Sequence, residues 1–600
     1  MVAVSFVLVL ALVSSTVVAL LVTDVFIGLF ARFKQQPTLE PPEIPTESVH
    51  RWIPLEEETS TPTSGEDPAD IGLSYILQQL NIQPDEFTKR TNFTDRFGVT
   101  HLYGIPLHQG SLIEDLHAAV HIKDSRVFFY SATTVIVDDH ALTKRSPTIP
   151  ESTIKASSED AVKSPTIPES TVNISPEDAV KAAVDCLGVP FYRDTTPVKE
   201  SYKTDNGKIL VWVFHLRDSP ITQWIEVKVN VITGDIVSKE DVKREFIYTA
   251  IELPNENPRD GFSTIVNPEN LQASPNGWTD GFELKGNNAE AKSKKYRTLG
   301  TTTRGRFKGD FDPTLPPKTP QNLLAGAINA FYVTNMVHDI TYQYGFNEPA
   351  GNFQQDNFGR GGIGGDSIII NLQNSKRKNY VSFDTLPDGH PGVLNLHIST
   401  ATKPNRDPAL DNTLMIHELT HGVSSRLTGG AQTKMCMSKI ECGGLSEGYS
   451  DVIAIIFTAK PEDTRNTEKV IGEYVRGDSQ GIRRYPYTTD MKVNPLKYKD
   501  AVGEKDPYHL GEIWASLLLE VYWNFVEAYG FSANLHDATQ KEGNIIFLQL
   551  FVGMLMIQPC NPTFISAYDA MLVADAVYYG GIHKHLITKG FAKRGLGSIS

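Results

Sequence analysis

Two histidines and a glutamate in the segment LMIHELTHG have the types and spacing that suit metal chemistry. His417 and His421 are four positions apart, so on a helix their imidazoles project from one face, roughly 40° apart. Two imidazoles placed in this way can bind one zinc ion. Glu418 follows His417 directly and points aside, so its carboxylate can hold the water on the metal. The pattern therefore predicts a zinc site with Glu418 as general base.

The alternative is an ordinary surface helix that happens to carry two histidines. The neighbours of the motif are apolar and predict burial, and a buried histidine pair needs polar partners. These neighbours are Leu414, Met415, Ile416 and Leu419. The zinc hypothesis accounts for this burial better than a solvated helix does.

A catalytic zinc site takes three protein ligands and leaves one position open. The segment GGLSEGYSD offers Glu447 as the third ligand. Asp451 lies four positions later in the same predicted helix, and its carboxylate can accept the free N–H of a ligand histidine. A Glu/Asp pair is by itself weak evidence, because most such pairs are solvated. Its position after the histidine motif gives it value.

The elements that must position these residues belong to the last part of the chain. With 600 residues, the chain is too long for one core. Residues 245–410 are rich in Gly, Asn and Pro, whereas residues 411–600 are mostly helical, and an active site can lie between two such halves. The helices are predicted at 411–428, 444–459, 509–530, 541–557 and 564–579.

Two small α+β units are predicted ahead of this region, over residues 71–140 and 175–244. Between them, residues 141–174 contain a Pro-rich duplication, in which SPTIPESTIKASSEDAVK is followed by SPTIPESTVNISPEDAVK. The repeat is too short and too rich in Pro for a solenoid, which favours a linker. Residues 20–70 also read as a linker.

The first residues predict export, with one alternative. Residues 2–23 carry no charge, which favours a signal peptide over residues 1–19 and a secreted protein. An uncleaved anchor oriented by Arg32 and Lys34 would instead leave the bulk of the chain in the cytosol. Sequons at Asn92 and Asn173 agree with a glycoprotein.

Composition excludes some other classes. The net charge is −15 with no concentrated basic stripe, which argues against a nucleic-acid partner. None of the four cysteines lies in a C-x-x-C pair, which disfavours a redox motif or a cysteine zinc site. Cys436 and Cys442 are near enough for a small disulfide loop, and free buried thiols are the equal alternative.

Two further patterns have simpler interpretations. His338 and Asp339 are adjacent in a helical block, where we favour packing and hydrogen bonding because no third ligand is close in sequence. The glycines at 359–365 lack the phosphate-loop pattern, so a tight turn before a strand at 367–372 is predicted.

Taken together, these segments resemble the fungalysin family of secreted metalloproteases, thermolysin-like enzymes of the gluzincin group. The resemblance rests on HELTHGVSSRLTGG, GLSEGYSD, FYVTNMVHDITYQYGF, NFGRGGIGGDSIIINLQ, QPCNPTFISAYDAMLVAD and FAKRGLG, in this order. It implies an α+β protein with a thermolysin-like catalytic domain of two lobes: a β-rich lobe over 245–410 and a helical lobe over 411–600. The units at 71–140 and 175–244 resemble the family's propeptide and inhibitory module.

Carried over by position, the resemblance makes His417, His421 and Glu447 the ligands of one zinc per chain. Glu418 becomes the catalytic base, and Asp451 supports a ligand histidine. It implies cleavage of protein or peptide substrates on the amino side of a hydrophobic residue, and maturation near Glu245. We expect a monomer inhibited by its own prodomain, with no stable membrane association. A catalytically dead binding protein is the rival class, and the intact motif argues against it.

The chain departs from the family pattern in two places. Tyr508 stands where the family has a histidine before Gly-x-I/V-W-A, and His509 is displaced by one residue. That histidine steadies the oxyanion in the family, so the donor here is His509 or Tyr508, and we favour His509 because a charged donor is stronger. His585 stands where relatives often have a cysteine, which leaves Cys560 without its expected partner.

Overall fold

The fold is described from a computed structural model. Within it, the described residues are 46–53, 67–113, 115–135, 174–191, 197–204, 207–218, 223–241, 245–294, 299–301, 303–433 and 435–597. The predicted signal peptide, the alternative anchor and nearly all of the duplicated linker lie outside these ranges. In the described part of the chain, no helix is long and apolar enough to cross a membrane.

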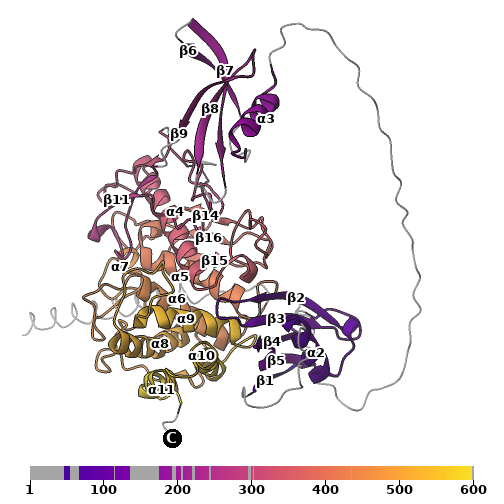
Figure 1. The fold of residues 1–600 in the computed structure, drawn as a ribbon. Helices are drawn as coiled ribbons and strands as arrows, with labels where there is room; N and C mark the ends of the chain where they lie inside the picture. The colour runs from indigo at the N-terminus through magenta and orange to yellow at the C-terminus, as the bar shows by residue number, and fades with distance from the viewer. Residues whose placement is uncertain are drawn as a thin grey trace, which may run out of the picture. The chain divides into compact units, whose positions relative to one another are not determined.

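The first module is a five-stranded sheet with one helix on it (Figure 1). The strand order is β1-β5-β4-β3-β2, with β1 at Thr46–Trp52, β2 at Phe87–Thr94, β3 at Thr100–Pro106, β4 at His117–Lys123 and β5 at Arg126–Val135. Helix α2 (Pro68–Leu80) packs against one face through Ile76, which meets Leu102 and Val120. The sequence predicts a linker over residues 20–70. This prediction is wrong for strand β1, which pairs with β5 at the edge of the sheet. Its short, polar sequence carries no clear alternation.

The second module is an antiparallel sheet of four strands, with α3 packed on it. Its elements are α3 (Pro176–Leu187), β6 (Val198–Thr204), β7 (Gly207–Arg217), β8 (Trp224–Asn230) and β9 (Ile236–Asp241). Helix α3 begins after Ser175, whose hydroxyl accepts a hydrogen bond from the Asp178 amide. Its apolar side meets Phe214 and Val227 of the sheet.

Residues 245–410 hold two small sheets and one long helix. The sheet orders are β11-β10-β13 and β12-β14-β16-β15. The elements are β10 (Ile247–Ala250), β11 (Ser263–Val266), β12 (Ala289–Ser293), β13 (Arg306–Phe307), α4 (Pro320–Gln343), β14 (Ile368–Leu372), β15 (Val381–Asp384) and β16 (Val393–Leu396). Helix α4 is buried on nearly all sides. A helix buried all round shows no amphipathic stripe, which is why this half reads as poor in helical pattern.

Residues 411–597 are helical, as the sequence predicts (orange to yellow in Figure 1). The helices are α5 (Asn412–Leu427), α6 (Ile440–Phe457), α7 (Glu473–Arg476), α8 (Pro507–Tyr529), α9 (Gly543–Ile557), α10 (Phe564–Tyr579) and α11 (Lys584–Lys593). Of these helices, only the short α7 and α11 were not predicted from the sequence. Sheets and helices together confirm the α+β class.

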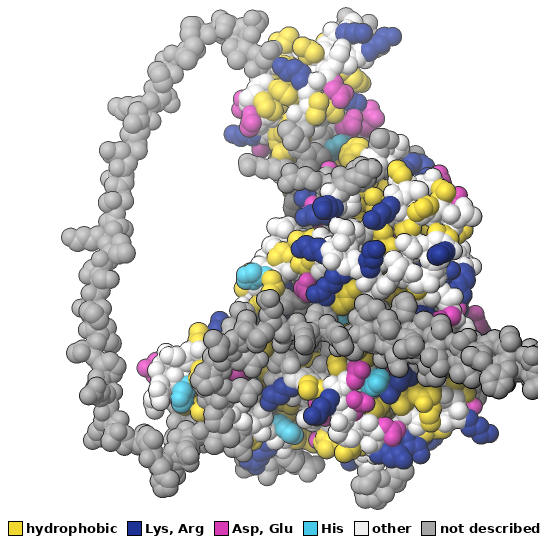
Figure 2. All heavy atoms as spheres, turned by 180° about the vertical axis from the view of Figure 1, so that it is seen from behind, with side chains coloured by type: hydrophobic (Ala, Val, Ile, Leu, Met, Phe, Trp, Pro, Cys, Tyr) yellow, Lys and Arg dark blue, Asp and Glu magenta, His cyan; other side chains and the backbone are white. Residues whose placement is uncertain are grey.

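The surface mixes charges of both signs. On the face drawn in Figure 2, Lys and Arg side chains are dispersed among apolar and neutral ones and do not form one continuous stripe. Acidic side chains lie in smaller groups on the same face.

Candidate metal centre

Helix α5 presents the two motif histidines side by side. Asp411 caps the helix by accepting a hydrogen bond from the Leu414 amide. The rings of His417 and His421 have centroids 4.8 Å apart, and their Nε2 atoms are 3.1 Å apart. The helical spacing therefore has the geometric effect that the sequence predicts.

Helix α6 brings Glu447 to the same point because it lies very close to α8. A Cβ added at Gly448 would come within 2.8 Å of the Gly511 carbonyl oxygen, and one at Gly511 would come within 2.4 Å of the Glu447 Cβ. A side chain at either glycine would push the helices apart. Glycine at both positions thus sets the depth at which the Glu447 carboxylate lies.

Two imidazole nitrogens and one carboxylate converge to form the candidate site. The Glu447 carboxylate lies 3.4 Å from His417 Nε2 and 3.6 Å from His421 Nε2. Donor atoms around a tetrahedral zinc with bonds of about 2.0–2.2 Å are about 3.3–3.6 Å apart. In the described part of the chain, these three residues are the one group of His, Cys, Asp or Glu placed to hold a metal. The donor set therefore fits zinc.

The outer nitrogens of both imidazoles are held by hydrogen-bond partners. His417 Nδ1 lies 2.7 Å from Asp451 Oδ1 and, because a carboxylate only accepts, this nitrogen carries the proton. His421 Nδ1 lies 2.8 Å from the Ser446 hydroxyl. Such contacts fix the ring orientation and leave Nε2 to bind a metal. Asp451 is thus positioned for the role expected of it.

Arg483 was not identified from the sequence. Its Nη2 lies 3.0 Å from Glu447 Oε2 and 2.9 Å from Asp451 Oδ1. Asp451 also accepts a hydrogen bond from the Tyr487 hydroxyl. The segment RRYPY that contains both residues is irregular and carries no motif, so local spacing offers no signal for them.

The charged groups of the site shift one another's pKa values. Burial disfavours a charged imidazole, but the Asp451 and Glu447 carboxylates outweigh it and raise the pKa of His417 to about 10. Burial likewise opposes charge on Glu447, whereas His417, His421 and Arg483 lower the pKa of Glu447 to about 2. Glu447 is therefore ionised at neutral pH, as a metal ligand must be.

Glu418 differs from its neighbours in having no partner. Its side chain is buried, and among the described residues no hydrogen-bond donor or ion-pair partner contacts it. Burial raises the pKa of Glu418 to about 7. A carboxylate with its acceptor capacity unused and a raised pKa is suited to accept a proton.

Tyr508 and His509 lie in the first turn of α8 and point in different directions. His509 Nδ1 lies 3.2 Å from Glu504 Oε2, and its Nε2 lies 3.8 Å from Asp506 Oδ2, both in the loop before the helix. The Tyr508 ring lies 5.5 Å from the Arg483 guanidinium. Burial and the Glu447 carboxylate raise the pKa of Tyr508.

These positions bear on the sequence-based preference for His509, which stays a prediction. Consecutive helical residues project about 100° apart, so both cannot face the metal ligands. In this structure Tyr508 is beside Arg483 and Glu447, and His509 is turned toward two acidic loop residues.

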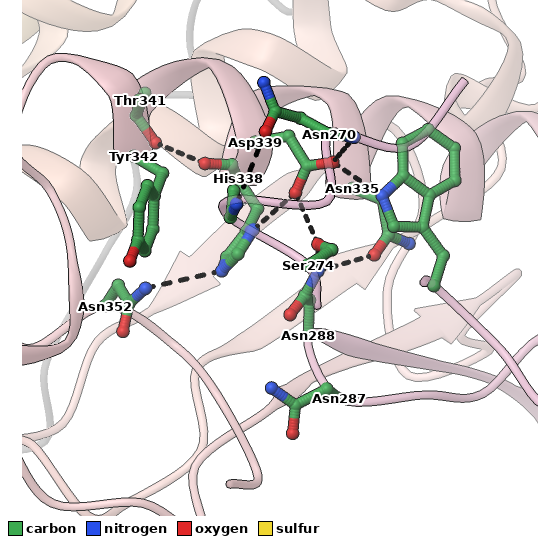
Figure 3. Close-up of polar contacts among 12 residues, drawn as sticks. Asn270, Ser274, Asn287, Asn288, Asn335, His338, Asp339, Thr341, Tyr342 and Asn352 are labelled. Atoms are coloured by element: carbon green, nitrogen blue, oxygen red, sulfur yellow. Dashed lines mark hydrogen bonds and ion pairs between the residues drawn. The ribbon is translucent and has the colours of Figure 1, made fainter. Parts of the chain in front are cut away.

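The His338–Asp339 pair has the hydrogen-bonding role that we favour from sequence (Figure 3). Asp339 accepts hydrogen bonds from the backbone N–H of Asn270 at 2.8 Å, the Ser274 hydroxyl at 2.6 Å and the Trp278 indole N–H at 2.8 Å. His338 Nδ1 lies 2.9 Å from the same carboxylate. Asp339 thereby ties the loop before β12 to helix α4, and its acceptor capacity is used in doing so.

The cysteine pairing differs from the small loop considered from sequence. A disulfide joins Cys436 to Cys560, and Cys442 is a buried free thiol. The Asn561 amide donates to the Cys436 carbonyl over 2.8 Å, so the two loops lie together. Cys442 is already inside α6, and its Sγ contacts the Lys439 carbonyl at 3.0 Å. A Cys436–Cys442 loop is therefore excluded in this structure.

Comparisons with known proteins point to one family. The family model described as Fungalysin metallopeptidase (M36) matches residues 247–600, more than half of the chain. "Extracellular metalloproteinase 1" of Trichophyton equinum is 38% identical over 363 residues, which cover 57% of this chain and 58% of that protein. "Extracellular metalloproteinase 5" of Arthroderma otae is 35% identical over 418 residues, covering 66% of this chain and 65% of that protein. The matches thus span less than two thirds of the relatives' lengths.

Among solved structures, the "Bacillus megaterium YpeB C-terminal domain" has 13% sequence identity and a TM-score of 0.10, over 31% of this chain and 70% of that chain. At that TM-score the likeness says nothing about the fold or the function of this chain.

Proposed function

The chain belongs to the fungalysin metallopeptidase family, and we propose that it is a secreted zinc endopeptidase made as an inactive precursor. Family membership implies a catalytic metal, and the donor set favours zinc. His417, His421 and Glu447 would hold the ion. The observation that carries this proposal is the convergence of two imidazole Nε2 atoms and one carboxylate at separations of 3.1 to 3.6 Å. Two imidazoles and a carboxylate form a known catalytic zinc set.

When bound, the zinc ion supplies a Lewis acid to the peptide carbonyl and lowers the pKa of the attacking water. Glu418 is the proposed general base. Its buried carboxylate accepts the water's proton and then delivers it to the nitrogen of the departing amine. Asp451 holds the proton on His417 Nδ1 throughout, and Arg483 neutralises the charge that Asp451 adds to the site.

Tyr508 is the proposed donor to the oxyanion. Its burial beside Arg483 and Glu447 supports this role, as does its raised pKa, because a phenol that stays protonated always has a hydrogen to donate. His509 is paired with Glu504 and would need to break that contact to reach the substrate.

The proposed organisation follows from where the family match begins. Residues 1–19 would be a signal peptide, and residues 71–140 and 175–244 would be two prodomain modules. They would be joined by the linker at 141–174, with residues 20–70 a further linker apart from strand β1. The family match starts at residue 247, which supports a mature enzyme that begins near Glu245. Its lobes would be 245–410 and 411–600.

Protein or peptide substrates outside the cell are the proposed targets. The names of the matched relatives describe extracellular metalloproteinases, which favours secretion over the membrane-anchored alternative. We propose that the enzyme is a monomer and that its own prodomain is its inhibitor.

Metal analysis of the purified, trimmed protein tests the central claim. We expect one zinc per chain, loss of peptidase activity with phenanthroline, recovery on adding zinc back, and no effect of serine-protease inhibitors. Full activity in protein stripped of zinc would refute the mechanism.

A further inference from the structure

One face of the β1–β5 sheet carries three histidines. Side chains along a strand alternate between the two faces of a sheet. Leu102 and Val120 pack with α2, whereas the adjacent His101 and His121 point to the opposite face, where they are register partners. This second face is buried as well, because His101, His117 and His121 are each at most 1% exposed.

The helical C-terminal part of the chain covers this face. His117 Nε2 donates to the Gly429 carbonyl at 3.0 Å, and the Tyr103 hydroxyl donates to the Met556 carbonyl at 2.7 Å. The Tyr103 ring lies against Gly430, where an added Cβ would come within 2.7 Å of the ring. The module therefore docks on the loop that follows α5 and on the end of α9.

A second set of contacts ties the same module to α10. Lys123 Nζ donates to the Val577 carbonyl at 2.5 Å. The Tyr578 hydroxyl donates to Asp95 Oδ2 at 2.6 Å, and the Phe97 and Tyr578 rings stack at 3.9 Å. The docked face is thus held at its centre by histidines and at its edge by a lysine and a tyrosine.

Few groups around the histidines at the centre of the contact can stabilise a positive charge on them. His101 Nδ1 and His121 Nδ1 are 2.9 Å apart, so one must donate and the other accept. Asp95, 3.4 Å from His101 Nε2, can compensate a proton on His101. The other titratable or charged groups that face the cluster are His50 on β1, which lines the same pocket as His117, Arg96 in the β2–β3 turn, Tyr103 on β3, Lys123 on β4, and Tyr578 and Tyr579 on α10. Among the residues that the structure describes, no carboxylate contacts His117 or His121.

We propose that this contact is an acid-sensitive latch. The module at residues 67–135 stays docked on the C-terminal helices while His117 and His121 are neutral. It is released when they take up protons, because two imidazolium ions without a carboxylate partner cannot stay buried beside Lys123.

The sign and the pH window follow from burial. Burial lowers the pKa of His117 to about 4 when the module is docked, and burial together with His101 and His117 lowers the pKa of His121 well below its usual value. In a released module both would titrate near ~6.5. Docking is therefore complete above about pH 6.5 and is lost as the pH falls toward the docked pKa. Each histidine weakens docking about tenfold per pH unit within that window.

A role of the latch in controlling proteolysis rests on the proposed function. The docking contact itself does not. Docking involves no metal ligand and no group of the proposed catalytic set. It can therefore be measured in an inactive protein.

The test is hydroxyl-radical footprinting of the full chain carrying Glu418→Gln, between pH 7.5 and pH 4. Tyr103 and Met556, each 1% exposed, report on the contact. Tyr130, under α2, reports whether the module itself stays folded, and Met415, in α5, reports on the helical part. We expect Tyr103 and Met556 to become reactive with a midpoint between pH 6.5 and pH 4, while Tyr130 and Met415 stay protected.

Neutral replacements separate the histidines from general acid effects. His117→Gln keeps an amide donor toward Gly429, and His121→Asn keeps a polar group toward His101. The double variant should stay docked at pH 7.5 and move the midpoint down by at least one pH unit, whereas His585→Gln, an exposed residue, should not move it. A parent chain that stays closed at pH 4, or a double variant with an unchanged midpoint, overturns the latch. If the double variant is open already at pH 7.5, the titration of the parent chain and of each single variant decides.

Discussion

Arg483 donates from Nε to Oδ2 of Asp451 over 2.7 Å, across 32 positions of the sequence. The same guanidinium reaches Glu447 at 3.0 Å through Nη2. It therefore joins the carboxylate that orients His417 to the carboxylate that would bind the metal. Its side chain is only 6% exposed, so removing its charge would break a buried ion pair with Asp451.

Arg483→Met should weaken zinc binding and lower stability. Loss of a partner that holds the groups around a metal typically costs 10- to 100-fold in affinity, and breaking a buried ion pair costs about 3–5 kcal/mol. Zinc affinity from competition with a chelator, and Tm, would measure both. The matched control is Arg484→Met, because Arg484 is adjacent yet pairs with Glu512 at 3.0 Å instead. Equal zinc affinity in the two variants would show that Arg483 does not support the site.

Glu418→Gln should bind zinc normally and lose at least ~10²-fold in turnover, the scale of general-base catalysis. The amide cannot accept the water's proton, yet Glu418 is not a proposed ligand and its carboxylate has no described partner to lose. Zinc content and kcat on one preparation provide the measurement. His421→Ala should behave in the opposite way and lose the metal. Near-normal turnover in Glu418→Gln would mean that another residue is the base.

Tyr508→Phe should lower kcat by about 10²–10³-fold, the typical effect of removing one oxyanion donor. His509→Ala should leave kcat nearly unchanged, because His509 faces Glu504 and Asp506. Zinc content must be equal in both variants for the comparison to hold. A large loss in His509→Ala alone would reverse the assignment, and no loss in either would place the donor elsewhere.

The precursor should be latent, and a chain that begins near Glu245 should be active. The two modules ahead of that point lie outside the family match, which starts at residue 247. Casein hydrolysis by the precursor, by the trimmed chain, and by the trimmed chain with residues 71–244 added in trans would measure this. If the precursor degrades casein as fast as the trimmed chain, the prosegment only assists folding.

The residues that the sequence predicts well are those related by a helical repeat. His417 and His421 share a face because four positions make about one turn, and Glu447 and Asp451 are related in the same way on α6. The helices themselves follow from local patterns of apolar residues and from caps such as Ser175. Helix α4 lacks such a pattern because burial on all sides removes the contrast between faces.

What remained open in the sequence depends on contacts between distant segments. Tyr508 and His509 are neighbours with similar polarity, and only the packing of α8 decides that Tyr508 lies beside Arg483 and that His509 lies beside Glu504. Cys436 pairs with Cys560 across 124 positions because their loops pack together, although Cys442 is far nearer in the chain. The number of residues between two cysteines therefore does not predict whether they form a disulfide.

The sequence by itself determined the histidine motif, its glutamate, the helical second half and the resemblance to one family, because each is recorded in short local patterns of residues. Only the tertiary structure decided that Arg483 bridges Asp451 and Glu447, that His117 is buried against Gly429, and that His121 is buried against His101. These contacts form when segments that are 32 positions apart, as for Arg483 and Asp451, or 312 positions apart, as for His117 and Gly429, are packed together. Their energies come from burial and charge compensation that no local pattern records.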